Sequence, residues 1–447
     1  MAEHREGTIH TPPEWGIEPV PKNHRYLGKL DYFVLWSSLG NGLLVFWAGS
    51  LLVPQLDVYT ALMIIVAGSL IGSLPLALAG IIGSDNAVPT MVMLRPAFGI
   101  RGSFLPSLLN VFQLIGWTTF EIVVMALAAD QVSIKLLGYS VFYVWVIFFS
   151  AILVLTGIEG PLTFVKQWLE KFEIWVLYGS VIWITYVLAT SGQIHGVLAS
   201  PGKGGLPLLL AMDIVIAMPV SWMPLVSDYS RFAKSSSAGF WGTYIGYVIA
   251  NVIGYSVGAL LVLLTSTADI VAAILLVQFG AITLLFILTY EADNGFADLY
   301  SAAVSIQNLF PQAKQRLLVI GVGILSMVLA MLIPIMQYEG FLLWIGAIFI
   351  PIFGILLIDY FVINRRRYNV QAIYVHGGAY RYWREINLRA IAAWISGAAI
   401  YNLIVTYAPD LGASLPTLLA SAVIYWLLSK IHPRENNLIA TSQSNPE

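Results

Sequence analysis

Long apolar runs separated by short polar stretches make up most of the chain. Twelve of these runs come close to the roughly 20 residues that an α-helix needs to cross a bilayer. Their approximate centres lie at residues 42, 70, 116, 148, 180, 217, 251, 285, 325, 351, 398 and 421. The pattern therefore predicts an all-α integral membrane protein with 12 transmembrane helices.

The composition agrees with this prediction and excludes other classes. Of the 447 residues, 58% are hydrophobic and only 10% are charged, whereas a soluble protein carries about 25% charged residues. The chain has no cysteine, which excludes disulfides and thiolate metal sites. A net charge of -2 gives no indication of nucleic-acid binding.

The positions of Lys and Arg set the expected orientation, because cytoplasmic loops carry an excess of both. With twelve spans and both termini inside, 20 of the 22 basic residues fall in inner segments, and only Lys135 and Lys203 fall outside. We expect a multi-pass protein of the plasma or inner membrane with both ends cytoplasmic.

The polar segments suggest a division of the chain. Residues 1–28 are polar and proline-rich and lack an apolar h-region, so we expect a cytosolic tail and no cleavable signal peptide. The expected order is this tail, a ten-helix core over 29–364, a cytosolic linker over 365–388, two peripheral helices over 389–432 and a cytosolic tail over 433–447.

A polar stripe marks the third span. Gln113, Trp117 and Glu121 are four residues apart and so lie on one face of a helix. A carboxylate at membrane depth costs about 3 kcal/mol on insertion scales, so Glu121 should face a cavity or a partner. An aromatic ring one turn from a buried carboxylate suits a flat ligand that carries nitrogen atoms.

Two spans, five helices apart, carry residues that favour a break. In the sixth, Pro219 and Pro224 flank Trp222 and remove two amide donors. Such interruptions in corresponding halves point to the binding site of transporters with inverted repeats. The first span contains a cluster of small and polar residues. It fits either close helix packing or an unwound segment that faces a ligand or ion, and its members are Ser37, Ser38, Gly40, Asn41 and Gly42.

The eighth span holds a second polar cluster. Glu291, Asn294 and Asp298 share one helix face, while Asp293 points elsewhere. These acids either line a hydrated path or mark a helix end at the membrane interface. The fifth span opens with VKQWLEKFEIW, which we interpret as an interfacial entry without an evident site.

Several stretches together resemble the nucleobase:cation symporter family 1, which includes purine and cytosine permeases, hydantoin and allantoin transporters and hydroxymethylpyrimidine transporters. The matching pieces extend from residue 95 to 391: RPAFGIRGSFLPSLLNVFQLIGW, SWMPLVSDYSRF, ADLYSAAVS, DYFVINRRRY and GGAYRYWREINLRA. The resemblance implies a leucine-transporter-like fold of two inverted five-helix repeats plus two helices, with helices one and six broken. It also implies cation-coupled uptake of a planar heterocycle.

The resemblance also implies roles for individual residues. The base would stack on Trp117 and be covered by Trp222, as on the matching aromatic residues of the family. Glu121 and Asp298 fall where the family has amides that read the base, and Gln113 resembles a glutamine of cytosine permeases. The broken first span, around Ser38 and Asn41, would supply backbone contacts.

Carboxylates in place of two amides change the expected substrate. An ionised carboxylate only accepts hydrogen bonds, whereas an amide also donates. Glu121 and Asp298 therefore favour bases with amino or ring N–H groups, such as cytosine, adenine or an aminopyrimidine, over uracil. FADLYSAAVS and LWSSLGNGLLVFWAG look more like the hydroxymethylpyrimidine branch, so the substrate stays open, and a hydantoin or allantoin carrier is the alternative.

The coupling ion is either Na⁺ or H⁺, with no other cofactor expected. A family-like sodium site would lie between the first and eighth spans, and its predicted members are Ser38, Asn41, Thr289, Ala292 and Asp293. A hydroxyl is usual where Asp293 stands. Removal from water favours the protonated form of a carboxyl, so Glu121, Glu291 or Asp293 is the candidate proton carrier.

Two further classes were weighed against a carrier. A channel needs a continuous polar pore, but the polar residues concentrate on a few helices near the midplane. An enzyme needs a catalytic cluster, and all six histidines fall in tails or loops. We expect a monomer that binds a small heterocycle within the bilayer. Asp31, Asp228 and Asp359 lie at cytosolic helix ends, where they either pair with Arg95, Arg101 or Arg231 as an inner gate or are solvated charges.

Overall fold

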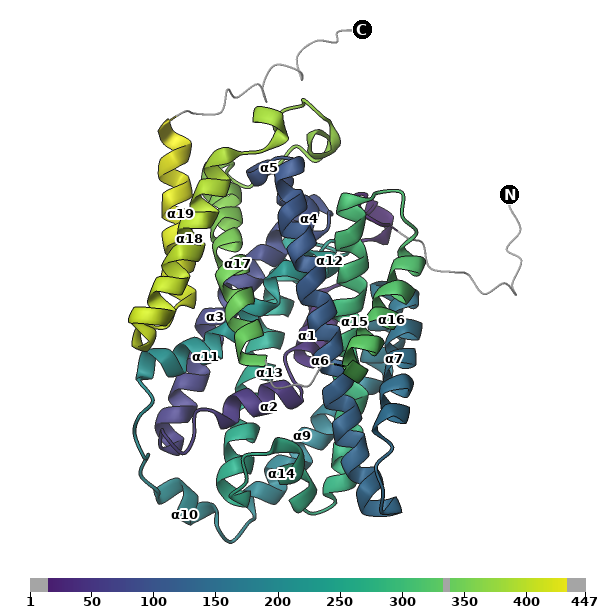
Figure 1. Ribbon diagram of the computed structural model, residues 1–447, viewed down its shortest axis with the longest axis vertical. Coiled ribbons are helices and arrows are strands. Elements are labelled where there is room, and N and C mark those ends of the chain that lie inside the picture. The colour runs from purple at the N-terminus through teal and green to yellow at the C-terminus, as the bar shows by residue number, and fades with distance from the viewer. Residues whose placement is uncertain (1–14, 333–337, 432–447) are drawn as a thin grey trace, which may run out of the picture.

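A computed structural model describes residues 15–332 and 338–431 of the chain. The predicted tail over 433–447 lies outside these residues. Within the described ranges the structure is helical, apart from an isolated β-bridge between Leu27 and Ala233. Figure 1 shows α5 (Arg95–Phe98) and the loop after α17 (Tyr338–Ile358) at one end, with α10 (Ile194–Ala199) and α14 (Ile270–Leu276) at the other.

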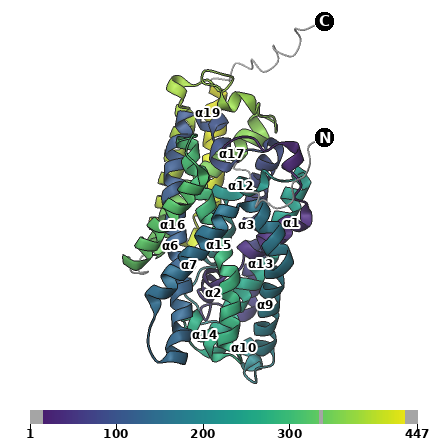
Figure 2. The ribbon, with the colours of Figure 1, turned by 90° about the vertical axis from the view of Figure 1, so that its right-hand side faces the viewer.

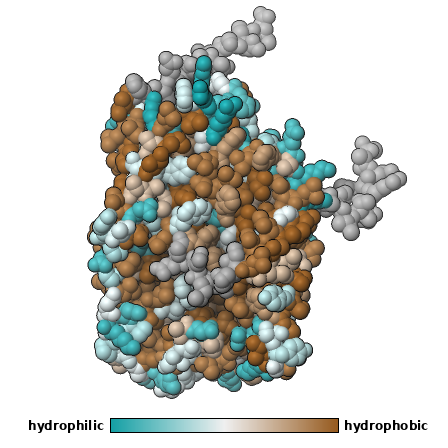
Figure 3. Space-filling view, in the orientation of Figure 1, coloured by the Kyte–Doolittle hydropathy of each residue, from teal (hydrophilic) through white to brown (hydrophobic). Residues whose placement is uncertain are grey.

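Among the described residues, ten helical segments are long and apolar enough to cross a membrane. Apolar side chains cover most of the lateral surface visible in Figure 3, and hydrophilic residues gather toward its upper and lower ends. The segments are α3 (Val58–Asn86), a short turn with α6 (Arg101–Leu137), α7 (Phe142–Glu159), a π-helix with α9 (Phe164–Ala189), α11 to α12 (Leu208–Ser230), α13 (Ser236–Thr265), α16 (Gln315–Leu332), the later part of α17 with a π-helical turn (Leu343–Ile363), a turn with α18 (Trp383–Tyr407) and α19 (Ser414–Ile431).

The remaining two predicted spans are the ones with polar centres. Helices α1 (Lys29–Leu39) and α2 (Leu43–Ser50) together make an eleventh span, bent by 61° at the break between them. Helix α15 (Gly280–Leu309) has 30 residues, or about 45 Å of helix, but carries three acidic residues. With α15 included, each of the twelve predicted centres falls in a span or at the break of the first.

Helix α15 lies inside the helical assembly. It packs along α6 and also contacts α7, α9 and α16, as Figure 2 shows. Glu291, Asp293 and Asp298 are at most 4% exposed. These acids therefore lie inside the helical assembly, and the alternative of a helix end at the interface is wrong, because the helix continues for 14 residues beyond Gly295.

A second group of helices surrounds the broken first span. Helix α13 packs against α1, α2 and α3, and α11 packs against α3. Glycines allow α2 and α13 to approach backbone to backbone: a Cβ at Gly258 would lie 1.9 Å from the Phe46 carbonyl oxygen, and one at Gly49 would lie 2.1 Å from that of Tyr255. Larger residues would separate these helices.

The last two spans lie at the edge of the assembly, as Figure 1 shows. Helices α18 (Leu388–Tyr407) and α19 pack against each other and against α17. The segment before them packs on the body, because the Tyr374 hydroxyl donates to the Ile17 carbonyl at 2.6 Å and the Tyr382 hydroxyl donates to that of Pro96 at 2.7 Å.

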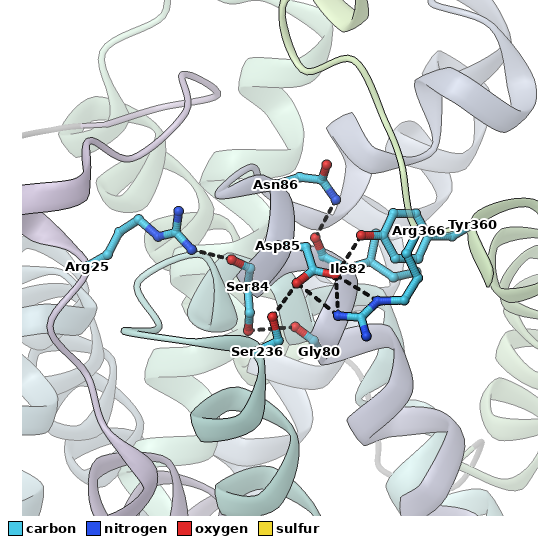
Figure 4. Close-up of polar contacts among 9 residues, drawn as sticks. All are labelled: Arg25, Gly80, Ile82, Ser84, Asp85, Asn86, Ser236, Tyr360 and Arg366. Carbon is cyan, nitrogen blue, oxygen red and sulfur yellow. Dashed lines mark hydrogen bonds and ion pairs between the residues drawn. The ribbon is translucent and has the colours of Figure 1, made fainter. Parts of the chain in front are cut away.

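A cluster around Asp85 joins four segments at the end that carries this loop (Figure 4). Asp85, near the end of α3, accepts hydrogen bonds from Ser236 at the start of α13 and from the Tyr360 hydroxyl at 2.7 Å. Arg366 pairs with the same carboxylate at 2.8 Å. Nearby, Arg25 donates to the Ser84 carbonyl. Arg366 thus ties the loop after α17 to the end of α3.

The acids predicted to form an inner gate have other partners. Asp31 pairs with Lys166. The Asp228 carboxylate accepts the Thr90 amide at 2.9 Å, and Asp359 accepts the hydroxyls of Tyr425 and Tyr368 at 2.8 and 2.6 Å. The predicted basic partners also bind elsewhere: Arg95 donates to Asn308, Arg101 pairs with Glu385, and Arg231 donates to Gly16 and Tyr300. The charge of Arg231 still acts on the Asp228 carboxylate, as predicted. The other bonds join these acids and arginines to different partners, because sequence gives no register between distant loops.

The Asp85 cluster leads to a stability prediction. Asp85→Asn removes the charge that Arg366 pairs with and should destabilise the fold by about 1–2 kcal/mol. The expected loss is small because the Arg366 guanidinium is half exposed and water screens the ion pair. Arg366→Ala should have a similar effect, and Arg367→Ala is the control, because its exposed side chain lies outside the cluster. Thermal unfolding in detergent measures the change; equal midpoints for Arg366→Ala and Arg367→Ala would contradict the prediction.

Candidate functional site

The site is built on the break of the first span. Helix α1 ends at Leu39 and α2 begins at Leu43. Gly42 lies between them, and a Cβ there would lie 2.7 Å from Glu291 Oε2 and 3.2 Å from Asn294 Nδ2. Gly42 is therefore the residue that lets α15 approach the break, and the unwound segment predicted from sequence is confirmed.

Glu291 satisfies the exposed amides at the start of α2. Its Oε2 accepts the Leu43 amide at 2.8 Å, and the Leu44 amide also bonds to this carboxyl. The first amides of a helix lack partners within the helix and form its positive end, so a carboxylate there is favourable. Glu291 is fully buried. It acts as a cap supplied by a helix about 250 residues away.

The sixth span breaks at Trp222. Helix α11 (Leu208–Ser221) ends there, a 3-10 turn follows over Met223–Leu225, and α12 (Val226–Ser230) continues the span. Pro219 and Pro224 flank the break as predicted. The Trp222 ring meets the Trp36 ring edge-on, with the centroids 6.0 Å apart. This contact holds Trp222 near the break of the first span.

The two breaks border a central cavity of about 30 Å³. It brings together Trp117, Glu121, Trp222 and Asp298, four of the residues predicted to bind substrate. An apolar cavity of about 150 Å³ is needed to hold benzene, so side chains of this closed site must move to admit a ring. The lining consists of Leu39, Leu44, Val45, Trp117, Glu121, Met218, Ser221, Trp222, Leu225, Asn294 and Asp298.

Aromatic residues surround Trp117 on the side of α17. The Phe341 ring lies 5.5 Å from the Trp117 ring, centroid to centroid, and the Phe120 ring lies 6.5 Å away. Both contacts are edge-on, which leaves the indole plane set by its neighbours before any ligand arrives. Phe341 was not predicted, since α17 shows no polar pattern.

Two carboxyls, Glu121 and Asp298, line this cavity, and a third lies next to them. Glu121 and Glu291 lie close enough for one to donate a hydrogen bond to the other, and Asp298 is also near Glu121. Asp298 is 4% exposed. Like charges this close in a buried site repel each other. A carboxyl with a proton can donate as well as accept.

Gln113 lies outside the cavity lining. Its Nε2 donates to Asn110 Oδ1 at 2.5 Å, and Asn110 Nδ2 donates to the Ser305 hydroxyl at 2.9 Å and to the Pro224 carbonyl at 3.3 Å. These bonds join α6, α15 and the turn of the sixth span. Gln113 thus supports the site from one helical turn away. Its side chain bonds to Asn110 and does not reach the cavity.

The predicted cation residues separate into two sets. Ser38 and Asp293 come together, with the Ser38 hydroxyl 2.6 Å from Asp293 Oδ2. Asn41 is buried, and its Oδ1 lies 3.2 Å from a Cβ built on Gly254 in α13. Thr289 and Ala292 line a lateral groove against α7, and the Thr289 hydroxyl donates to the Phe286 carbonyl of its own helix. Asp293 also lines this groove, so it lies between the two sets.

One buried acid was missed by the sequence analysis. Glu173 ends the π-helix Phe164–Glu173, and its Oε1 lies 3.0 Å from the Ser38 hydroxyl. It is fully buried, which corrects the interpretation of this segment as a plain interfacial entry. Its place directly before the apolar run that begins at Ile174 was the signal available in the sequence.

A cavity at the crossing of two broken helices defines the class of protein: a membrane transporter with its site near the midplane. The profile of one family, described as "Permease for cytosine/purines, uracil, thiamine, allantoin", matches residues 19–428. The chain therefore belongs to this permease family, as the resemblance implied.

Relatives and solved structures agree. The chain is 27% identical over 420 residues to the hydantoin permease of Microbacterium maritypicum, covering 88% of this chain and 84% of that one. It is 24% identical over 474 residues to the allantoin permease of Bacillus subtilis, covering 95% and 94%. The fold matches Mhp1, a nucleobase-cation-symport-1 family transporter solved in a closed conformation with bromovinylhydantoin bound, at a TM-score of 0.81 and 22% identity, covering 95% of this chain and 97% of that one. The leucine-transporter-like architecture is thereby confirmed.

The cap on α2 can be tested by substitution. Glu291→Ala leaves the Leu43 and Leu44 amides without an acceptor and should destabilise the protein by about 1–3 kcal/mol. Glu291→Gln keeps an acceptor oxygen and should lose less. The measurement is the unfolding midpoint in detergent, with Thr289→Ala on the same helix as control; a Glu291→Ala variant as stable as this control would exclude the capping role.

Proposed function

We propose that the protein is a cation-coupled secondary transporter that imports an amino-bearing nucleobase or a related planar heterocycle by alternating access. The observation that carries this proposal is the meeting of Trp117, Trp222, Glu121 and Asp298 at one central cavity. Membership of the permease family supports transport without chemical change. Because one chain supplies the whole cavity, the working unit is a monomer.

Stacking supplies the shape selection. Trp117 and Trp222 come from α6 and from the break of the sixth span, so they can cover opposite faces of a flat ring. Base–aromatic stacking is worth about 1–3 kcal/mol for each ring. The small volume of the cavity means that Trp222, the half-buried member of the pair, moves to admit the ligand.

The carboxyls supply the edge selection. Asp298, nearly fully buried, offers acceptor oxygens to an exocyclic amino group. Glu121, which lies close to Glu291, offers acceptor oxygens when ionised and also a donor when protonated. Cytosine and aminopyrimidines present an amino group beside a ring nitrogen acceptor and match this pair, whereas uracil presents a carbonyl where the amino group would be.

A cyclic ureide is the second candidate substrate. The relatives named hydantoin permease and allantoin permease favour it, and ring N–H groups of a ureide could also donate to the carboxyls. The orientation we propose, with both termini cytoplasmic in the cell membrane, rests on the Lys and Arg distribution. Either Na⁺ or H⁺ serves as the coupling ion.

The stacking rings lead to a direct prediction. Trp117→Ala and Trp222→Ala should each weaken the binding of the carried base by about 5-fold to 150-fold, the equivalent of 1–3 kcal/mol. The measurement is ligand-induced thermal stabilisation with cytosine, adenine, uracil, hydroxymethylpyrimidine, hydantoin and allantoin. Trp175→Ala, on the exposed face of α9, is the matched control. Unchanged affinity in both site variants would remove this cavity as the binding site.

The edge selection is tested at Asp298. Asp298→Asn replaces one acceptor by a donor, so the preference for cytosine over uracil should fall by about 10-fold or more, since a hydrogen bond to a charged group is worth about 1.5–3 kcal/mol. The measurement is the ratio of the two dissociation constants in each protein. Asp269→Asn, an exposed helix cap at the far end, should keep the original ratio; a constant ratio in Asp298→Asn would argue against carboxylate reading of the amino group.

A further inference from the structure

The Ser38 hydroxyl lies between two buried carboxyls from different helices. It is 2.6 Å from Asp293 Oδ2 in α15 and 3.0 Å from Glu173 Oε1 at the end of the π-helix. The two carboxyls also contact each other. Ser38 is fully buried, Glu173 is fully buried, and Asp293 is 1% exposed.

A count of hydrogen atoms limits the charge of this group. A serine hydroxyl has one hydrogen, so it can donate to one carboxyl only. The second short contact and the direct carboxyl contact need another hydrogen between oxygens that would otherwise repel. With both carboxylates ionised, the group would hold two like charges in a region where charge is costly. One additional proton supplies the hydrogen for the second serine contact or for the contact between the carboxyls.

The charged and titratable groups around Ser38, Glu173 and Asp293 have partners of their own, so the additional proton belongs between α1, α15 and the π-helix. On the π-helix, Lys166 pairs with Asp31 of α1 two turns nearer the start of both helices, and Lys171 lines a lateral groove. From α9, the Tyr178 hydroxyl donates to Ser37. On α15, the charges of Glu173 and Glu291 both act on Tyr290, and Glu121 of α6 interacts with Glu291 and Asp298.

We propose that Glu173, Ser38 and Asp293 form a proton-binding site, and that this proton is the coupling ion of the transporter. This inference rests on the proposed transport function. A proton from water on one side adds to a carboxylate oxygen to form an O–H bond, and the same bond breaks when the proton passes to water on the other side. Without it, the paired carboxylates repel and α1 separates from α15.

The position of Ser38 links the proton to the substrate. Ser38 is next to Leu39, the last residue of α1 and part of the cavity lining. A change in the contact between α1 and α15 therefore changes the wall of the substrate cavity. Glu173 binds the proton and affects the substrate cavity only through the contact between α1 and α15.

Two measurements test the site, the first without any substrate. Infrared spectra of the full-length protein near neutral pH should contain a carbonyl band of a buried protonated carboxyl that is lost in Glu173→Gln. Glu159→Gln, an exposed residue at the end of α7, should retain the band. If the spectra of wild type and Glu173→Gln agree, the proton is not held there and the proposal is overturned.

The second measurement uses radiolabelled cytosine in proteoliposomes. In Na⁺-free buffer, an imposed pH gradient should drive accumulation by the wild type, and a protonophore should abolish it. Glu173→Gln should retain cytosine counterflow but only equilibrate its substrate, with an accumulation ratio of about one. Accumulation driven by a Na⁺ gradient at equal pH, unaffected by a protonophore, would overturn the proposal.

The two measurements separate the possible failures. Absence of cytosine counterflow in the wild type would contradict the proposed function for this substrate, while the infrared result would still decide the proton site. Counterflow without the carboxyl band would retain the transport function and reject the site. Ser38→Ala, which lacks the bridging hydroxyl but keeps both acids, should retain the band and lose part of the accumulation.

Discussion

The hydrogen bonds from α15 to the two halves of the broken first helix are the interaction on which the rest of the structure depends. A break at membrane depth leaves amides and carbonyls without partners, and no water in the hydrocarbon can replace them. Glu291 accepts the Leu43 amide at the start of α2, and Asp293 accepts the Ser38 hydroxyl in the last turn of α1. Acids two residues apart on one helix therefore fix both sides of the break.

These contacts join the two groups of helices. Helices α1, α2, α3, α11 and α13 pack together, and α15 packs with α6, α7 and α16. The central cavity lies between the groups, and its lining comes from both. A motion that separates α1 or α2 from α15 would change the wall of this cavity. It would also change the surroundings of the buried acids, so the cavity and the acids depend on one set of contacts.

Much of this architecture follows from sequence alone, because hydrophobic length and basic loops decide the span count and a helical period places Trp117 and Glu121 on one face. Prolines around Trp222 were enough to predict the second break. What sequence did not provide is the pairing of distant side chains. Glu173 meets Ser38 across 135 residues, Gln113 turns to Asn110, and Thr289 faces α7. Each depends on the rotation of one helix against another, which a local pattern of polar residues does not fix.

The acids at the cavity also explain how a carboxyl can stand where an amide would be expected. An ionised carboxylate accepts only, but a carboxyl that holds a proton offers one donor and one acceptor, as an amide does. Glu121 lies beside Glu291, whose Oε2 already accepts the Leu43 amide of α2. A base that binds at Glu121 would therefore lie next to the cap on the broken helix, and a change in the charge of one carboxyl would act on the other.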